Sequence, residues 1–188
     1  GAVSRPGEPG LDQDIPRLAA ELHSLGVTDV VMPMFPIPDR FGAPGTDEGF
    51  LAYLQRVAAG LTRDDWQRTA ALLNDRAGKL RREGLRLGYH NHNPEFAPLG
   101  ATNGLELLLA ETSAGELAFE LDIGWTAAAG VDPVALLQRY GRRFQLLHVK
   151  DIHATTQSNF LLRQDPAEVG SGHLPWAKIL PAAYAAGA

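Results

Sequence analysis

Three segments of this chain share one pattern, in which an apolar run ends abruptly in His, Asp or Lys side chains. They span residues 85–92, 117–122 and 144–151, and each has the composition of a short buried strand. Stretches with helical spacing separate them, so the predicted order is strand, helix, strand, helix, strand. In parallel α/β architectures that order brings the carboxyl ends of neighbouring strands to one edge, where ligands and metals bind. The pattern therefore predicts a parallel α/β fold with a polar cluster at one mouth.

The rest of the chain continues this alternation. A β-branched run over residues 27–34 indicates a fourth strand, and Thr62 to Asp65 resembles a capping box with Asp in place of Glu. The segment over residues 35–48 carries prolines and glycines and is typical of a functional loop after a strand. Helical spacing of apolar residues predicts helices over residues 12–25, 47–59, 62–83, 104–111, 132–140 and 175–186. Residues 1–10 show no periodic pattern and are predicted to form a loop.

Composition excludes several classes of protein. The chain has 188 residues, of which 45% are hydrophobic and 21% charged, which is ordinary for a globular domain. No apolar run approaches the ~20 residues of a membrane span, and a net charge of −5 argues against a nucleic-acid surface. Cysteine is absent, so any metal must be held by His, Asp, Glu or water, a donor set that favours Mn, Mg, Co or Zn. We expect a cytoplasmic protein, although the absence of cysteine fits a periplasm equally well.

Four motifs follow one another over residues 84–180. Tyr-His-Asn-His at residues 89–92 precedes Glu-Phe, and Glu-Leu-Asp-Ile-Gly-Trp occupies residues 120–125. His-Val-Lys-Asp follows at residues 148–151, and Glu-Val-Gly-Ser-Gly at residues 168–172. In this order the motifs resemble the sugar phosphate isomerase/epimerase group of the xylose isomerase-like TIM barrels.

The resemblance implies a (β/α)8 barrel with a divalent metal at its mouth, bound from four strands. Asp122 and His148 fall on two usual ligand positions, and His90 falls where many relatives carry a ligating or catalytic glutamate. The fourth position is a glutamate on a later strand, for which the chain offers no candidate. Because a complete barrel needs at least ~200 residues, we expect an incomplete barrel of about four parallel strands. This would be a single domain over residues 1–188, truncated at both ends, whose open edges invite association with a partner chain.

Site roles are assigned from the strand ends and the motifs together. Asp122 closes an apolar strand, where a carboxylate without a partner would be costly, so a functional role is favoured. His148 lies within Leu-Leu-His-Val and would be a core histidine by default, but its alignment with Asp122 favours a ligand. We expect His90, Lys150 and Glu168 to act in catalysis, His92, Glu95, Trp125 and Asp151 to contact substrate, and His90, Asp122 and His148 to bind the metal.

Several of these residues also admit a structural role. Only one of His90 and His92 is expected to face the mouth directly, with His90 preferred as the ligand. Lys150 and Asp151 form either an ion pair at the strand end or a substrate contact, and Trp125 either walls the substrate or packs over the rim. Glu95 and Glu168 could instead be solvated charges in loops, without a role in the site.

The predicted function is that of a metal-dependent isomerase or epimerase acting on a sugar, keto-sugar or inositol-like polyol through an enediolate-type intermediate. A metal that chelates two adjacent oxygens acidifies the carbon between them, and a nearby carboxylate or imidazole moves the proton. The alternatives are a dehydratase or lyase on a related polyol, and a catalytically inactive carbohydrate-binding protein on the same scaffold. The abasic-site endonuclease branch needs several zinc ions and a DNA-binding surface, which the acidic balance disfavours. The expected partners are a small sugar or polyol and a second copy of the chain, with neither nucleic acid nor membrane.

Overall fold

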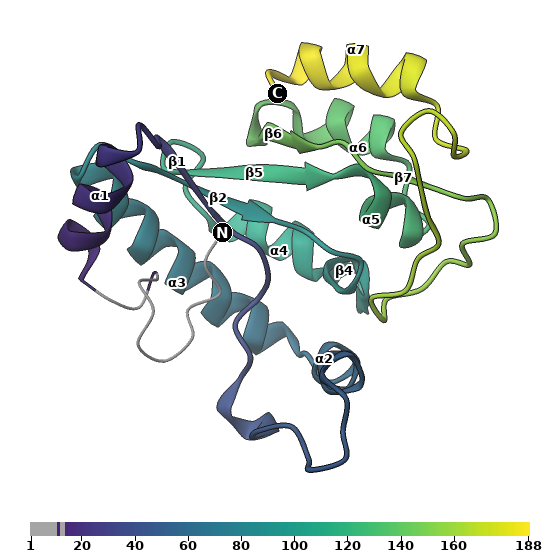
Figure 1. Ribbon diagram of the computed structural model, residues 1–188, viewed down its shortest axis with the longest axis horizontal. Helices are drawn as coiled ribbons and strands as arrows, with labels where there is room; N and C mark the ends of the chain where they lie inside the picture. The colour runs from purple at the N-terminus through teal and green to yellow at the C-terminus, as the bar shows by residue number, and fades with distance from the viewer. Residues whose placement is uncertain (1–10, 12–13) are drawn as a thin grey trace.

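The computed structural model describes residue 11 and residues 14–188 (Figure 1). The predicted loop over residues 1–10 lies outside the described part of the chain. The helices are α1 (Ile15–Ser24), α2 (Phe50–Ala59), α3 (Arg63–Arg82), α4 (Gly104–Glu111), α5 (Ile123–Ala128), α6 (Pro133–Tyr140) and α7 (Trp176–Ala186). The strands are β1 (Asp29–Met32), β2 (Arg86–His90), β3 (Pro98–Leu99), β4 (Thr102–Asn103), β5 (Leu117–Asp122), β6 (Phe144–His148), β7 (Asp151–Ile152) and β8 (Pro166–Ala167). Among the described residues, no helix combines the length and apolar character that crossing a membrane requires.

Four strands form one parallel sheet in the order β1-β2-β5-β6. The pairs β1–β2, β2–β5 and β5–β6 are all parallel, which confirms the predicted parallel α/β architecture. The register sets His90 beside Glu120 and Asp122 beside His148. The sheet is an incomplete barrel, as predicted from the motifs. Two short antiparallel pairs, β3–β4 and β7–β8, were not predicted and lie in the loops that follow β2 and β6.

One face of the sheet packs against the helices. Tyr89, Phe119 and Phe144 are fully buried there, with ring centroids 6.1 Å apart for Tyr89 and Phe119 and 6.2 Å apart for Phe119 and Phe144. Helix α3 contacts β2 and β5, α4 packs on α3, α7 contacts β6, and α6 packs on α7 (Figure 1). Leucines on these helices, such as Leu73 and Leu108, are buried in the same core. We refer to this side of the strands as the core face.

The opposite face of β2 and β5 carries two small residues, Gly88 and Ala118, below its polar end. A Cβ added at Gly88 would lie 3.5 Å from Leu146 and 3.5 Å from Val31, so these positions meet on the side away from Tyr89. Because successive residues of a strand point to opposite faces, His90 and Glu120 fall on this side too. We refer to it as the mouth face, since it leads to the carboxyl ends of the strands.

Helix caps agree with the sequence in most places. The Asp65 carboxylate accepts a hydrogen bond of 2.8 Å from the Thr62 backbone N–H, which confirms the capping box at the start of α3. The helix predicted from Asp132 begins at Pro133 with Asp132 as its cap. Helix α5 was not predicted, and it begins directly after β5 with the Asp122 side chain as its cap. Its sequence, Ile-Gly-Trp-Thr-Ala-Ala, is too short for a periodic signal and contains a helix-weakening glycine.

Candidate metal centre

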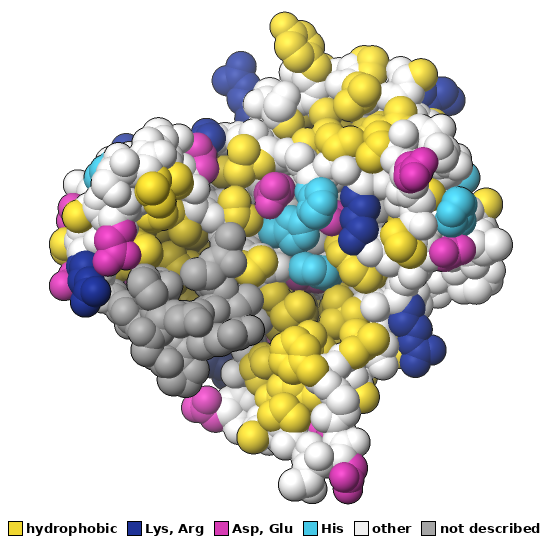
Figure 2. Space-filling model, in the orientation of Figure 1, with side chains coloured by type: hydrophobic (Ala, Val, Ile, Leu, Met, Phe, Trp, Pro, Cys, Tyr) yellow, Lys and Arg dark blue, Asp and Glu magenta, His cyan; other side chains and the backbone are white. Residues whose placement is uncertain are grey.

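His90, Asp122 and His148 are the last residues of β2, β5 and β6, and their side chains converge at the mouth. One ligand atom from each can be chosen so that all three lie within 4.8 Å of one another. Asp122 Oδ2 is 3.1 Å from His148 Nδ1 and 3.6 Å from His90 Nε2. Figure 2 shows histidine side chains gathered near the middle of this face of the molecule. The structure thus brings together the three residues that were predicted to bind a metal.

Asp122 is held rigidly by its surroundings. Its side chain is fully buried, and Oδ1 accepts a hydrogen bond of 2.8 Å from the Trp125 backbone N–H in the first turn of α5. Its backbone N–H donates to Asn91 Oδ1 over 3.0 Å. Oδ2 is buried and has no hydrogen-bond partner among the described residues. Burial raises the pKa of Asp122, against the opposing effect of the Trp125 N–H and the neighbouring cationic groups.

The two histidines present their ring nitrogens differently. His90 is buried, and its Nδ1 lies 3.1 Å from Glu120 Oε2, so Nε2 faces Asp122. Burial lowers the pKa of His90 and thereby favours the neutral imidazole, the form that binds metal. His148 is about half exposed and turns Nδ1 toward the same carboxylate. No role in the site was predicted for Glu120. Its place two residues before Asp122 on a strand nevertheless puts both side chains on one face.

The donor set fits a divalent cation. A carboxylate and two imidazoles are ligands that Zn and other borderline ions accept, and three protein ligands leave positions open for substrate, as in catalytic sites. The unpartnered Oδ2 of Asp122 supports this fit, because a buried acceptor without a donor is costly unless a cation meets it. The described residues provide no fourth side chain to the group.

His92, Trp125 and Lys150 form a wall beside the three ligands. The ring centroid of His92 lies 5.0 Å from that of His90 and 5.4 Å from that of Trp125, and Lys150 Nζ lies 4.6 Å from the Trp125 ring centre. The expectation that only one of His90 and His92 faces the mouth is therefore wrong, because residues two apart project to the same side. Burial, followed by the charges of His90 and Lys150, lowers the pKa of His92 to about 3. Its buried Nδ1 has no hydrogen-bond partner among the described residues.

Two of the predicted substrate contacts, Glu95 and Asp151, have hydrogen-bond donors inside the protein. Glu95 is fully buried and accepts hydrogen bonds from the Tyr89 hydroxyl over 2.8 Å and from the His92 backbone N–H over 3.1 Å. Asp151 is fully buried and accepts from Trp176 Nε1 over 2.7 Å and from backbone N–H groups of the loop that leads to α7. Both carboxylates are buried with internal donors, and their predicted contacts with substrate stay predictions. Asp151 also forms no ion pair with Lys150 within the described part of the chain.

Burial acts differently on these two carboxylates. Burial of Glu95 raises its pKa to about 7, since the hydrogen bonds it accepts only partly offset the loss of water. For Asp151 burial is outweighed by the hydrogen bonds from Trp176 and the loop, which hold its pKa below the ordinary value. Glu168 is exposed just after β8 and does not join the converging groups, so its catalytic role stays a prediction.

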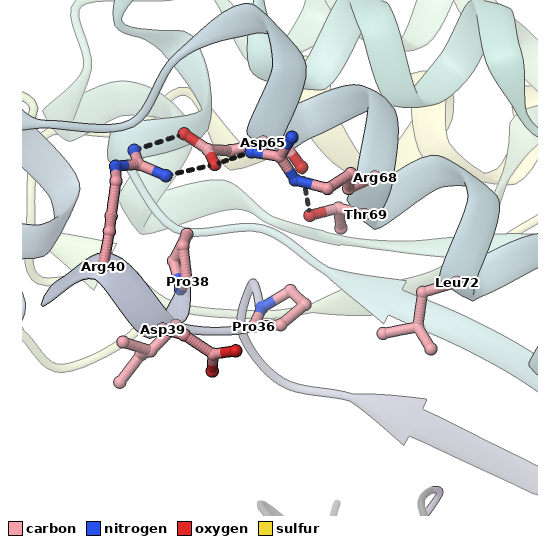
Figure 3. A pocket seen from close by; sticks show the side chains of 9 residues that line it. Pro36, Pro38, Asp39, Arg40, Asp65, Arg68, Thr69 and Leu72 are labelled. Carbon is pink, nitrogen blue, oxygen red and sulfur yellow. Dashed lines mark hydrogen bonds and ion pairs between the residues drawn. The ribbon is translucent and has the colours of Figure 1, made fainter. Parts of the chain in front are cut away.

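A cavity of about 430 Å³ lies elsewhere, between residues 36–40 and the first half of α3 (Figure 3). Arg40 donates hydrogen bonds from both terminal nitrogens of its guanidinium to the Asp65 carboxylate. Arg68 donates a further hydrogen bond of 2.6 Å to the same carboxylate. The hydrogen bonds from Arg40 outweigh burial and hold the pKa of Asp65 well below its ordinary value. The charges of Arg40, Arg68 and Asp65 are therefore paired, and they tie the loop after β1 to α3.

Comparison with known proteins gives a consistent result. The family described as "Xylose isomerase-like TIM barrel" matches residues 9–187. Inosose dehydratase of Lacticaseibacillus casei is 28% identical over 91 residues, which cover 48% of this chain and 30% of that protein. A sugar phosphate isomerase/epimerase from Parabacteroides distasonis has a TM-score of 0.58 at 22% identity, covering 90% of this chain and 62% of the other. The structure of an IOLI protein with a binding zinc atom has a TM-score of 0.58 at 14% identity, covering 92% of this chain and 55% of the other.

These matches differ in what they establish. At 22% and 14% identity the structural likenesses show the fold alone. The match to the inosose dehydratase spans less than a third of that protein's length. The activity and substrate of a whole relative therefore do not transfer with the fold.

Proposed function

The chain belongs to the xylose isomerase-like TIM barrel family, and from that premise we propose that it forms the metal-binding part of an isomerase or epimerase acting on a sugar, keto-sugar or inositol-like polyol. The observation that carries the proposal is the convergence of His90, Asp122 and His148, with Asp122 Oδ2 buried and unpartnered. A divalent ion held by these residues would supply a Lewis acid that acidifies the C–H on the carbon next to a substrate carbonyl.

The wall beside the ligands supports a polyol substrate. The Trp125 ring offers an apolar surface of the kind on which the C–H face of a sugar ring packs. His92 is neutral at physiological pH, and its unpartnered Nδ1 suits a hydrogen bond with a substrate hydroxyl. The Lys150 ammonium lies over Trp125, where it would stabilise negative charge that develops on a substrate oxygen. Proton transfer is assigned to Lys150.

A dehydratase is the second candidate, because the inosose dehydratase of L. casei is similar to this chain over 91 residues. Isomerisation, epimerisation and dehydration share one early event, the removal of a proton from a carbon next to a carbonyl. In isomerisation and epimerisation a proton returns to a carbon atom of the substrate. In dehydration a neighbouring hydroxyl group leaves as water. The same arrangement of side chains supports both outcomes.

The test is proton exchange in D₂O with added Mn²⁺ or Zn²⁺, followed by NMR on a panel of ketoses and inososes. Deuterium at the carbon next to the carbonyl with a change of configuration supports the isomerase or epimerase, and loss of water supports the dehydratase. Asp122→Asn should abolish exchange, because it removes the charge that holds the cation while retaining an acceptor for the Trp125 N–H. Saturable sugar binding with no exchange would identify a binding protein instead. Metal-independent exchange that survives Asp122→Asn would contradict the proposed site.

A further inference from the structure

Glu120 lies at the mouth beside the three converging residues without being one of them. It is opposite His90 in the register of β2 and β5, and it precedes Asp122 by two residues on β5. Both relations put its side chain on the mouth face. Its Oε2 is 3.1 Å from His90 Nδ1, while His90 Nε2 is 3.6 Å from Asp122 Oδ2. The His90 ring is therefore placed between two carboxylates, one on each side of the imidazole.

The contact with Glu120 determines which nitrogen of His90 carries the proton. A carboxylate oxygen only accepts hydrogen bonds, so the nitrogen that contacts it must donate. In the neutral imidazole Nδ1 then carries the hydrogen, and Nε2 is left with a lone pair. That lone pair faces Asp122 Oδ2, which is also an acceptor and has no hydrogen-bond partner among the described residues. Two acceptors that face each other across a buried gap are a favourable arrangement only when a cation joins them.

Glu120 has no other evident task. Its side chain is 25% exposed, and within the described residues its carboxylate contacts no Lys or Arg and makes no hydrogen bond other than that to His90. The other acidic side chains near the mouth are engaged elsewhere, Glu95 with Tyr89 and Asp151 with the loop before α7. The position of Glu120 is therefore explained by His90 alone.

We propose that Glu120 is a positioning residue for the metal centre: it accepts the Nδ1–H of His90, fixes that tautomer, and turns the Nε2 lone pair toward the place where a divalent cation would meet Asp122. The inference rests on the proposed function, because it requires the cation to bind at His90, Asp122 and His148. Carboxylates that hold the far nitrogen of a ligating histidine orient the ring and strengthen it as a ligand, and their loss typically weakens metal binding by ~10–100-fold.

The first experiment is titration of the 188-residue chain with Zn²⁺ alone by isothermal calorimetry. Glu120→Ala should bind zinc ~10–100-fold more weakly than the wild type. Glu120→Gln should lose less, because the amide oxygen of glutamine still accepts the Nδ1–H. The matched control is Glu116→Ala, which removes a glutamate just before β5 that pairs with Arg81 at 3.3 Å, and which should leave zinc affinity unchanged. Metal-free melting curves of each variant show whether folding is affected.

The second experiment reads the tautomer directly and does not depend on any variant. Long-range ¹H–¹⁵N NMR of the metal-free wild type should show His90 protonated at Nδ1, and the Glu120→Ala spectrum should lose that preference. Protonation of His90 at Nε2 in the wild type would overturn the inference. So would an unchanged zinc affinity in Glu120→Ala when Asp122→Asn abolishes binding, an outcome that leaves the proposed function intact. Absence of zinc binding by the wild type would overturn both.

Discussion

The two faces of β2, β5 and β6 belong to the same strands but differ in how completely their side chains are packed and paired. On the core face Tyr89, Phe119 and Leu121 are fully buried against neighbours that fill the space around them. On the mouth face the strands carry small residues and then end in His90 and Asp122, whose polar atoms are left partly without partners. Adjacent residues of one strand thus serve stability and binding separately. Alternation along a strand allows a chain to change one of these properties with little effect on the other.

The sharpest test of this separation compares Asp122→Asn with Leu121→Ala, neighbours on β5 that point to opposite faces. Saturating metal should stabilise the wild type by ~2.7 kcal/mol at 100 times the dissociation constant. Asp122→Asn should lose this stabilisation completely while its metal-free melting temperature changes little. Leu121→Ala should lower the free energy of unfolding by about 2–5 kcal/mol, because it leaves a cavity at a fully buried site.

Thermal melts with and without Zn²⁺ measure both effects. Leu121→Ala should keep the zinc-induced rise in melting temperature that the wild type shows. A Leu121→Ala protein that still folds but has lost the zinc response, or an Asp122→Asn protein that does not fold, would show that the two faces are not separable.

Glu95 joins the two faces, because it accepts from Tyr89 on the core side and from the His92 backbone at the mouth. Its pKa of about 7, against an ordinary value of 4.5, means that the folded state keeps a proton that the unfolded state releases. The resulting stability is fully present below pH 4.5 and is lost as the pH rises through about 7. At 1.36 kcal/mol per pKa unit the loss is on the order of 3 kcal/mol.

Glu95→Gln should therefore remove part of the pH dependence of stability between these limits. Urea denaturation at several pH values measures it, and the difference between variant and wild type cancels the titration of His92 and Asp122, which both proteins share. Glutamine also changes the hydrogen bonds, which adds a constant offset, so the change of the difference with pH is the relevant quantity. Parallel stability curves for the two proteins would show that Glu95 does not titrate in this range.

Gly124, in α5, tests how tightly the wall of the mouth is packed. A Cβ there would lie 2.9 Å from Lys150 Cγ and 3.2 Å from the Lys150 carbonyl oxygen. Gly124→Ala should destabilise the protein by ~1–3 kcal/mol, as overpacking does, and should displace Lys150 from the Trp125 ring. Zinc affinity should stay unchanged, because Lys150 is not a ligand. Loss of zinc binding in this variant would extend the binding region into the wall.

Tyr184, on α7, is the position where we expect the smallest effect of a substitution on stability. Its side chain is 85% exposed in the described structure and belongs to neither face of the sheet. Tyr184→Ser should change the free energy of unfolding by no more than about 0.5 kcal/mol. Chemical denaturation measures this change, and zinc affinity should equal that of the wild type. A larger loss of stability would mean that α7 has a contact at this position.

The strand ends were the part of the fold that sequence predicts well. An apolar run that stops at His90, Asp122 or His148 predicts, in a parallel sheet, a polar residue at the carboxyl end of a strand. The structure places all three residues at strand ends that meet. Helix α5 was not predicted, because six residues with an internal glycine are too few to show the helical spacing of apolar residues. Its cap, Asp122, had been assigned only to metal binding. Local patterns therefore determine elements better than they determine the several contacts of one side chain.

The site was predicted less completely, because its supporting contacts cross between strands. The pairing of Glu120 with His90 depends on the register of β2 and β5, which no local pattern specifies. The burial of Glu95 depends on the hydroxyl of Tyr89 from the core face, and that of Asp151 on Trp176 from α7. Each of these carboxylates looks like a loop or strand-end charge until the three-dimensional arrangement supplies its donors.

The double use of Asp122 has a consequence for how an ion would be captured. Because Oδ1 is bound to the first turn of α5, the carboxylate cannot rotate freely, and Oδ2 stays directed at the two imidazoles. The rotational freedom of this side chain is lost when the chain folds, not when the ion arrives. Folding therefore completes the ordering of this ligand in advance, so that capture of the ion carries no further ordering cost at Asp122.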